Sequence, residues 1–281
     1  MSRLLRPTIL SLALLTLLGS FVESSANWPY WASDAASTRY VPFDQIHRGN
    51  VDSLRILWRY RLPDAQIVAD EQDFEAARYK GTPLVIDGVL YTVTPFGVAL
   101  ALDATTGEEL WRFDTMGRYD DSTGQYLNRG VGYWSDEDGN TRILFGTWSD
   151  TLYSLDAKTG LPDPAFGDQG RVDLTQGLRA SVIKDRFGLA SPPTIVGDVA
   201  IVGSIILDWH NGESPFHYVS PGDVRGYDVR TGEQLWRFHT IPQPGEIGWD
   251  QWEGTSWSHL GAANVWGTIS ADPELGYAYL P

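Results

Sequence analysis

The chain has 281 residues, with 36 Asp or Glu against 21 Lys or Arg, and a formal net charge of −15. An acidic surface repels phosphates and anionic membranes, so nucleic-acid binding is not expected. Cysteine is absent, which excludes disulfides, a redox thiol and a cysteine-ligated metal site.

The first 26 residues are predicted to be a signal peptide. Arg3 and Arg6 form a positive start, and the apolar run Thr8–Leu18 is too short to span a bilayer comfortably. Small residues at Ser24-Ser25-Ala26 predict cleavage after Ala26. An uncleaved anchor is the alternative. Export predicts a periplasmic location. Because the chain has no cysteine for disulfides, its stability must come from the burial of apolar side chains.

One unit recurs along the chain, in full at 101–115 and 226–240, in degenerate form at 154–160 and in part at 57–60. In the first full copy a strand ends at Asp103, whose carboxylate can accept hydrogen bonds from the turn backbone. Gly107 supplies a position that needs a positive φ, and Trp111 follows in the next strand. The unit is therefore a hairpin with a tryptophan at a fixed offset.

Each unit follows an earlier β-rich segment. The segment 82–94 holds two runs joined by Asp87-Gly88, 193–203 repeats that plan, and 141–148 is another strand. About four strands per repeat predict the blades of a β-propeller, an all-β fold of four-stranded antiparallel sheets. Only 74–79 is expected to form a short helical turn.

The repeats are spaced more widely than bare blades, which predicts long inserted loops at 117–125, 162–189 and 208–223. The last strand, Leu275–Pro281, has no following turn or partner. About three and a half blades are then present in 27–281. We expect a partial propeller, about half of an eight-bladed ring, completed by a further C-terminal half or another polypeptide.

Several of these segments resemble one known family. The start Trp28-Pro-Tyr30, with 38–51 after it, resembles the beginning of mature dehydrogenases that depend on pyrroloquinoline quinone (PQQ). The pattern Ala-x-Asp-x-x-Thr-Gly-x-x-x-Trp at 101–111 is similar to the tryptophan-docking repeat of that family's eight-bladed propeller. The runs 191–193 and 222–228 look like its glucose and polyol branch.

The resemblance implies a cofactor site. PQQ is a flat quinone with three carboxylates, so it needs an aromatic platform, cations and a polarising divalent metal. Arg129 matches the family arginine that holds a PQQ carboxylate, and Trp266 matches the tryptophan that lies against the quinone. The alternatives are a surface ion pair for Arg129 and a core or interblade role for Trp266.

Further positions are implied in the same way. Asp208 falls where the family has an acidic ligand for Ca²⁺ or Mg²⁺, although an ordinary loop aspartate is the alternative. Asn264 and Ser191 sit near positions that hydrogen-bond the cofactor. Lys80 stands where the family has an acidic cofactor contact, and a lysine can still bind a carboxylate.

The chain also departs from the family pattern. The vicinal disulfide of the methanol-type enzymes is replaced by residues 123–125, and Gln125 stands where glucose-type relatives place a histidine. The family's catalytic aspartate and second metal ligand are expected beyond Pro281. No catalytic residue is therefore assigned, and the chain by itself is expected to be inactive.

The resemblance implies an oxidoreductase that oxidises an aldose, polyol or alcohol and passes electrons to a quinone or cytochrome. The rival interpretation is a non-enzymatic propeller scaffold of the kind that serves envelope protein assembly. A truncated, inactive gene product is a third possibility. A scaffold does not need Arg129 and Trp266 at cofactor positions, so these two residues favour the enzyme.

Overall fold

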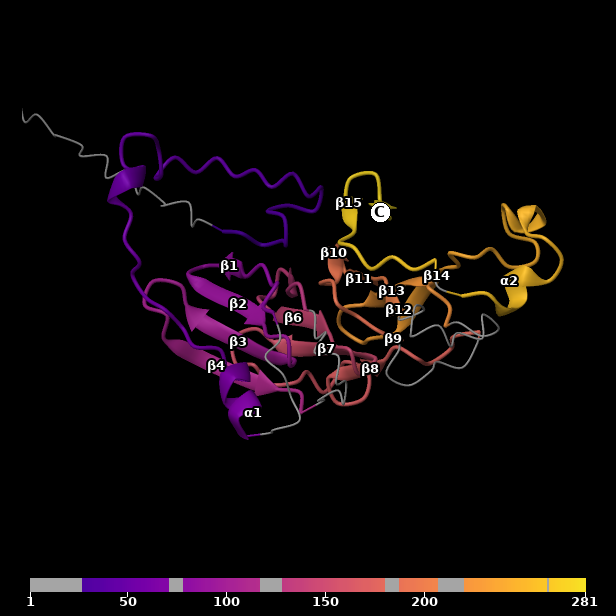
Figure 1. The fold of residues 1–281 in the computed structure, drawn as a ribbon, viewed down its shortest axis with the longest axis horizontal. Helices are drawn as coiled ribbons and strands as arrows, with labels where there is room; N and C mark the ends of the chain where they lie inside the picture. Colours follow the sequence, from indigo (N-terminus) through magenta and orange to yellow (C-terminus); the bar gives the residue numbers. More distant parts are fainter. Residues whose placement is uncertain (1–26, 71–77, 117–127, 180–186, 207–219, 262) are drawn as a thin grey trace, which may run out of the picture.

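The computed structural model describes residues 27–70, 78–116, 128–179, 187–206, 220–261 and 263–281. Its strands form three four-stranded antiparallel sheets in chain order, followed by a two-stranded hairpin that contacts the third sheet (Figure 1). We call the sheets blades 1, 2 and 3. The expected all-β propeller architecture and the three and a half blades are thereby confirmed. The predicted signal peptide lies outside the described residues.

The strands of each blade follow one another across the sheet. Blade 1 consists of β1 (Leu84–Ile86), β2 (Val89–Val93), β3 (Val98–Asp103) and β4 (Glu109–Asp114). Blade 2 consists of β5 (Gly132–Ser135), β6 (Thr141–Gly146), β7 (Thr151–Asp156) and β8 (Arg171–Asp173). Blade 3 consists of β10 (Thr194–Val196), β11 (Val199–Val202), β13 (Val224–Asp228) and β14 (Gln234–Phe238). The short strands β9 (Phe187–Gly188) and β12 (Ile205–Ile206) pair with each other, as do β15 (Ser270–Asp272) and β16 (Tyr277–Tyr279).

Helices in the described part of the chain are short. They are η1 (Val51–Ser53), α1 (Asp64–Asp70), η2 (Trp249–Gln251) and α2 (Ser256–His259). The helical turn expected at 74–79 falls mostly outside the described residues, and Tyr79 is not helical. None of the described helices has the length and apolar character needed to cross a membrane.

The repeated Asp-Thr-Gly turn forms as its residue types predict. The Asp103 carboxylate accepts hydrogen bonds from the backbone N–H groups of Thr105 (2.8 Å) and Thr106 (2.7 Å). Gly107 follows with φ of +73°, a conformation that side chains with a Cβ disfavour. Equivalent bonds to Asp156 and Asp228 close the matching turns of blades 2 and 3.

Tryptophans pin successive units together. The Trp58 indole N–H donates to the Ala104 carbonyl in blade 1 (3.2 Å), and the Trp111 indole N–H donates to the Ala157 carbonyl in blade 2 (2.8 Å). Each ring covers the turn glycine of the next unit: a Cβ added at Gly160 would lie 2.5 Å from two Trp111 ring carbons. The expected docking role of the repeat is confirmed for these two tryptophans.

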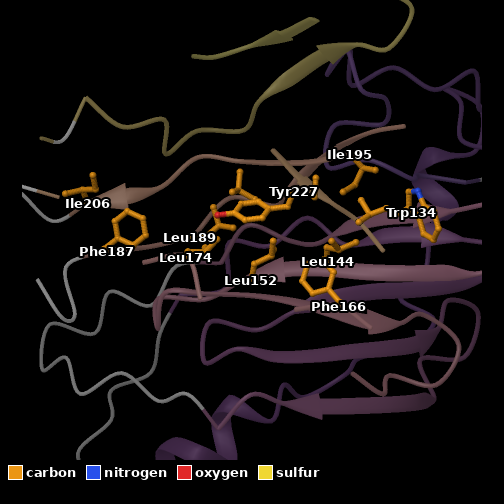
Figure 2. Packing of buried hydrophobic residues seen from close by; sticks show 13 residues of the cluster. Trp134, Leu144, Leu152, Phe166, Leu174, Phe187, Leu189, Ile195, Ile206 and Tyr227 are labelled. Carbon is orange, nitrogen blue, oxygen red and sulfur yellow. The ribbon is translucent and has the colours of Figure 1, made fainter. Parts of the chain in front are cut away.

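Neighbouring blades pack face to face, so the middle strands are buried on both sides. In blade 2, Ile143 and Phe145 join the core shared with blade 1, whereas Leu144 joins the core shared with blade 3. Alternation of side chains along a strand produces this division. Figure 2 shows the blade 2–3 core, with Trp134 at one end and Phe187 and Ile206 at the other.

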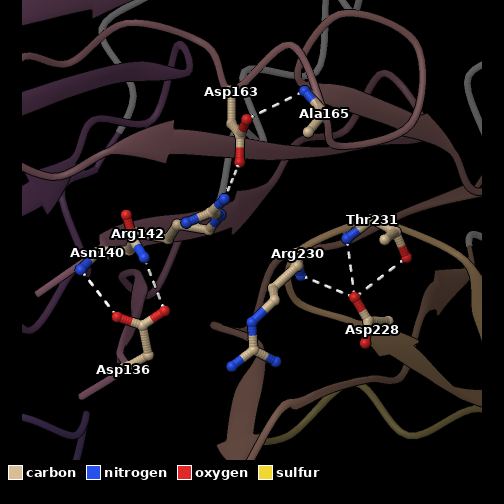
Figure 3. A network of polar contacts seen from close by, with 8 residues as sticks. All are labelled: Asp136, Asn140, Arg142, Asp163, Ala165, Asp228, Arg230 and Thr231. Carbon is tan, nitrogen blue, oxygen red and sulfur yellow. Dashed lines mark hydrogen bonds and ion pairs between the residues drawn. The ribbon is translucent and has the colours of Figure 1, made fainter. Parts of the chain in front are cut away.

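Blade 2 lacks a docking tryptophan, and a polar clasp joins it to blade 3 instead. The Trp134 ring on β5 makes cation–π contacts with the guanidinium groups of Arg142 (5.2 Å to the ring centroid) and Arg230 (4.6 Å). Its indole N–H donates to the Asp198 carboxylate (3.0 Å), which also pairs with Arg230 (2.7 Å). Figure 3 shows Arg230 beside the Asp228 turn, and Arg142 paired with Asp163.

Candidate cofactor site

Three residues from separate segments meet at one point of the structure. Arg129 precedes β5, Ser191 precedes β10 and Trp266 precedes β15, and β10 contacts both β5 and β15. Arg129 Nη1 donates to Ser191 Oγ (3.3 Å) and to the Trp266 carbonyl (3.2 Å). Ser191 Oγ donates to that same carbonyl (2.7 Å). The structure therefore brings together three of the residues that the sequence selected.

Backbone contacts fix Arg129 in this position. Its N–H donates to the Ala190 carbonyl (2.8 Å), and its own carbonyl accepts from the Thr82 N–H (2.9 Å). Gly130, with φ of +142°, lets the chain pass close to blade 1, because a Cβ there would lie 2.9 Å from the Thr82 carbonyl oxygen. The entrances of blades 1, 2 and 3 are thus tied to one another through this arginine.

The side chains of Arg129 and Trp266 form a cation beside an open aromatic surface. The guanidinium carbon of Arg129 lies 5.0 Å from the centroid of the Trp266 ring, within the range of a cation–π contact. Partial burial lowers the pKa of Arg129, but a guanidinium stays charged at physiological pH. Trp266 is 56% exposed, so much of its ring remains accessible to a planar molecule.

Asn264 is placed next to this group by the neighbouring backbone. Its Nδ2 donates to the Ser204 carbonyl (2.8 Å), and the Ser204 N–H donates to the Val265 carbonyl (3.0 Å). Gly203 permits this approach, since a Cβ there would lie 2.0 Å from the Val265 oxygen. Asn264 holds two segments of the site in register, and its contact to a cofactor remains a prediction.

Sequence reasoning missed Ser204. Its side chain is 1% exposed, and its hydroxyl has no hydrogen-bond partner within the described part of the chain. Burying a hydroxyl without a hydrogen-bond partner is costly, so such a hydroxyl typically bonds to a bound water, ion or ligand. The available signal was the strand Val199–Val202, which delivers Ser204 directly after a glycine.

The other selected residues are not joined to this group. Lys80 is exposed and lies two residues before Thr82, and among the described residues no hydrogen bond or ion pair links it to the group. Asp208 and Gln125 lie outside the described residues. Within the described ranges, no group of three or more His, Cys, Asp or Glu could hold a metal ion. The assignment of a divalent metal to Asp208 therefore stays a prediction.

The assembled residues fit a flat, carboxylated quinone. Trp266 offers a ring face, Arg129 a charged donor for a carboxylate, and Ser191 and Ser204 hydroxyl groups. Charge-assisted bonds from arginine to carboxylates are among the stronger polar contacts in proteins. The donor set thus has the aromatic and cationic components that such a molecule requires.

Comparison with known proteins agrees with this arrangement. Residues 28–281 match the family model described as the glucose/ethanol/alcohol dehydrogenase beta-propeller domain of the PQQ group. The chain is 29% identical to the quinate/shikimate dehydrogenase (quinone) of Acinetobacter baylyi, over 92% of this chain and 33% of that protein. It is 31% identical, with the same two coverages, to the dehydrogenase subunit of the alcohol dehydrogenase (quinone) of Gluconacetobacter polyoxogenes.

A solved structure shares the fold. The quinohemoprotein alcohol dehydrogenase from Comamonas testosteroni superposes with a TM-score of 0.67 at 25% identity, covering 90% of this chain and 35% of that one. The chain thus spans about a third of the length of these relatives.

Proposed function

Because the chain belongs to the family of PQQ-dependent dehydrogenase β-propellers, we propose that it forms the cofactor-binding part of an enzyme that oxidises a CH–OH group. The carrying observation is the Arg129 guanidinium held beside the exposed face of Trp266. These residues reach one place only through the packing of blade 2, blade 3 and the β15–β16 hairpin. The proposed substrate is an aldose, polyol or alcohol, and the proposed acceptor is a quinone or cytochrome.

The chain's own residues would bind and orient the cofactor. Arg129 would neutralise one carboxylate, and Trp266 would shield one face of the ring system from water. Ser191, Ser204 and Asn264 would contribute hydrogen bonds to the cofactor. Bound PQQ would supply a two-electron acceptor for the alcohol carbon. We further propose that Asp208 is a ligand of Ca²⁺ or Mg²⁺.

Further blades are proposed to complete the ring. An apolar groove of about 680 Å³ lies between blade 3 and the β15–β16 hairpin, lined by Trp236, Phe238, Tyr277 and Leu280 among others. Trp236 occupies the docking position of its repeat and is 37% exposed. A following blade would cover this groove, and we expect the general base to come from that part of the protein.

We also propose that the protein is exported to the periplasm, a location that the predicted signal peptide supports. N-terminal sequencing of the protein recovered from a periplasmic fraction should start at Asn27. A mature protein that retains Met1, or that stays in the cytoplasmic fraction, would contradict this proposal.

Titration with PQQ tests the function. The full-length protein should bind PQQ in the presence of Ca²⁺ with quenching of tryptophan fluorescence. Arg129→Ala should weaken binding by about tenfold or more, because a charge-assisted carboxylate contact is lost. Arg171→Ala is the matched control, since Arg171 lies on the outer strand β8 with a side chain that is 57% exposed. Absence of quenching in the unmodified protein would favour the scaffold interpretation.

A further inference from the structure

Arg225 is a buried cation that is not among the residues of the candidate cofactor site. It lies on β13 with no exposed surface. Its Nη1 donates to the Leu174 carbonyl of the segment after blade 2 (2.7 Å), and its guanidinium carbon lies 6.0 Å from the Phe187 ring and 5.7 Å from the Tyr227 ring. Its Nε and Nη2 have no partner within the described part of the chain. Removing a guanidinium from water has a large free-energy cost, which calls for a compensating role.

Charges of both signs surround Arg225: Asp223 and Asp173 favour its charged form, whereas Arg237 opposes it. Asp223, which directly precedes β13, is 3% exposed, and its carboxylate lies 4.0 Å from Arg237 Nε. Burial raises the pKa of Asp223 against the opposing effect of nearby cations, which include Arg179 and His239. The Asp223 carboxylate also accepts no hydrogen bond from Arg225. Ion pairing with Asp223 therefore does not by itself explain why Arg225 is buried here.

Arg225 contacts both segments that lead into the cofactor site. Its backbone pairs with Val202 on β11, and Ser204 follows two residues later. Its side chain lies over Phe187 on β9, which pairs with Ile206 on β12. The two paired strands, β9 and β12, form a short ribbon. Figure 2 shows Phe187 and Ile206 together at the end of the core near this ribbon.

The ribbon delivers groups of the site at one end, where β9 ends opposite the start of β12. After β9 come Ala190, whose carbonyl accepts from the Arg129 N–H (2.8 Å), and Ser191, whose hydroxyl donates to the Trp266 carbonyl. Before β12 comes Ser204, which bonds to the backbone beside Trp266. A displacement of the ribbon would therefore move Ser191 and Ser204 together.

We propose that Arg225 is a positioning residue for the cofactor site. Its planar guanidinium fills the space beneath the ribbon, meets the Phe187 ring and reaches across to the Leu174 carbonyl. An aliphatic side chain can fill that volume but leaves the buried carbonyl without a donor. The predicted effect on PQQ affinity rests on the function proposed above, whereas the predicted loosening of the ribbon can be measured without cofactor.

Arg225→Met tests the proposal in the full-length protein, with Arg171→Met as the exposed control. Hydrogen exchange should rise at amides 187–191 and 202–206 in the variant and stay unchanged in blade 1. The PQQ dissociation constant should rise about tenfold. The urea midpoint should also fall, because the buried Leu174 carbonyl loses its donor and Asp223 loses a nearby cation. Exchange and affinity are therefore measured well below the urea transition, where the variant is folded, and a rise in exchange confined to 187–191 and 202–206 separates positioning from a general loss of structure.

The outcomes are distinguishable. If the unmodified protein binds PQQ and Arg225→Met binds within twofold with unchanged exchange, the positioning role is wrong. If the unmodified protein does not bind PQQ, the proposed function fails, and the exchange data alone decide whether Arg225 holds the ribbon. If Arg225→Met does not fold, Asp223→Asn combined with Arg225→Met removes both buried charges and carries the same measurements.

Discussion

Substitution of the docking glycine of blade 2 should cost more than its backbone strain alone. Gly160 has φ of +71°, and an added Cβ would lie 2.5 Å from Cδ2 and Cε3 of Trp111. Gly139, in the β5–β6 turn of the same blade, has φ of +80° and nothing within 4 Å of an added Cβ. Gly160→Ala and Gly139→Ala therefore impose similar strain, and only the first displaces the ring.

The expected cost follows from these contacts. Left-handed strain of an alanine costs about 1–2 kcal/mol, and the smaller entropy of the unfolded chain returns about 0.4–1 kcal/mol. Gly139→Ala should thus lower the free energy of unfolding by roughly 1 kcal/mol. Gly160→Ala adds overpacking of about 1–3 kcal/mol and loss of the Trp111–Ala157 hydrogen bond, about 1 kcal/mol. The difference between the variants should be about 2–4 kcal/mol.

Urea unfolding followed by tryptophan fluorescence and circular dichroism measures both variants. Trp111→Leu, alone and combined with Gly160→Ala, completes a double-mutant cycle. Without the indole, the cost of Gly160→Ala should fall to that of Gly139→Ala. If the two alanine variants unfold within about 0.5 kcal/mol of each other in the unmodified background, ring docking does not restrict Gly160.

Two ionisable groups give predictions for pH. Hydrogen bonding to Arg112 lowers the pKa of Glu109 below its ordinary value of 4.5. The ionised Glu109 therefore stabilises the fold above pH 4.5, and this contribution is lost as the pH falls through its lowered pKa. Glu109→Gln should cost under about 1 kcal/mol at pH 7 and flatten the acid side of a plot of urea midpoint against pH, and an unchanged acid slope would contradict this. Burial raises the pKa of Tyr91 to about 12. The fold therefore favours the neutral phenol, and this contribution to stability is complete below pH 10 and lost as the pH rises through 12. Tyr91→Phe should match the unmodified protein at pH 8 and retain about 2 kcal/mol more stability near pH 12; if the two proteins lose stability in parallel between pH 8 and pH 12, the hydroxyl lies in water.

Local patterns in the sequence were enough to predict the blades. Asp103 and Gly107 carry their turn through bonds between near neighbours, so the residue types alone indicate it. The site was predicted only through the family resemblance, because Arg129 and Trp266 are 137 positions apart and meet through blade packing. Helix α1 was not predicted. It is short, and its Asp64 carboxylate accepts a hydrogen bond from the Phe96 N–H of blade 1 (3.2 Å), a contact between residues 32 positions apart that no local pattern indicates.

The contact between blades 2 and 3 shows that the turn glycine and the docking tryptophan of the repeat can occur independently. Blade 2 ends its turn in Leu161 and has no docking tryptophan, yet Gly232 of blade 3 keeps φ of +73°. A Cβ at Gly232 would lie 2.7 Å from a methyl group of Val172, and the Gly167 N–H donates to the neighbouring Thr231 carbonyl (2.8 Å). The glycine is thus required by its turn whether or not an indole covers it.

The missing indole is replaced elsewhere on the same interface. Trp134 joins β5 to the Asp198 turn through a bond between residues 64 positions apart, and no local pattern reveals such a pair. This clasp lies at the opposite end of the blade 2–3 core from Phe187, the end that leads to Ser191. The interface is thus held by the clasp at one end, by the buried core, and by the Gly167–Thr231 and Arg129–Ala190 backbone bonds. The relative placement of Arg129 and Ser191 therefore depends on residues outside the cofactor site as well as on those within it.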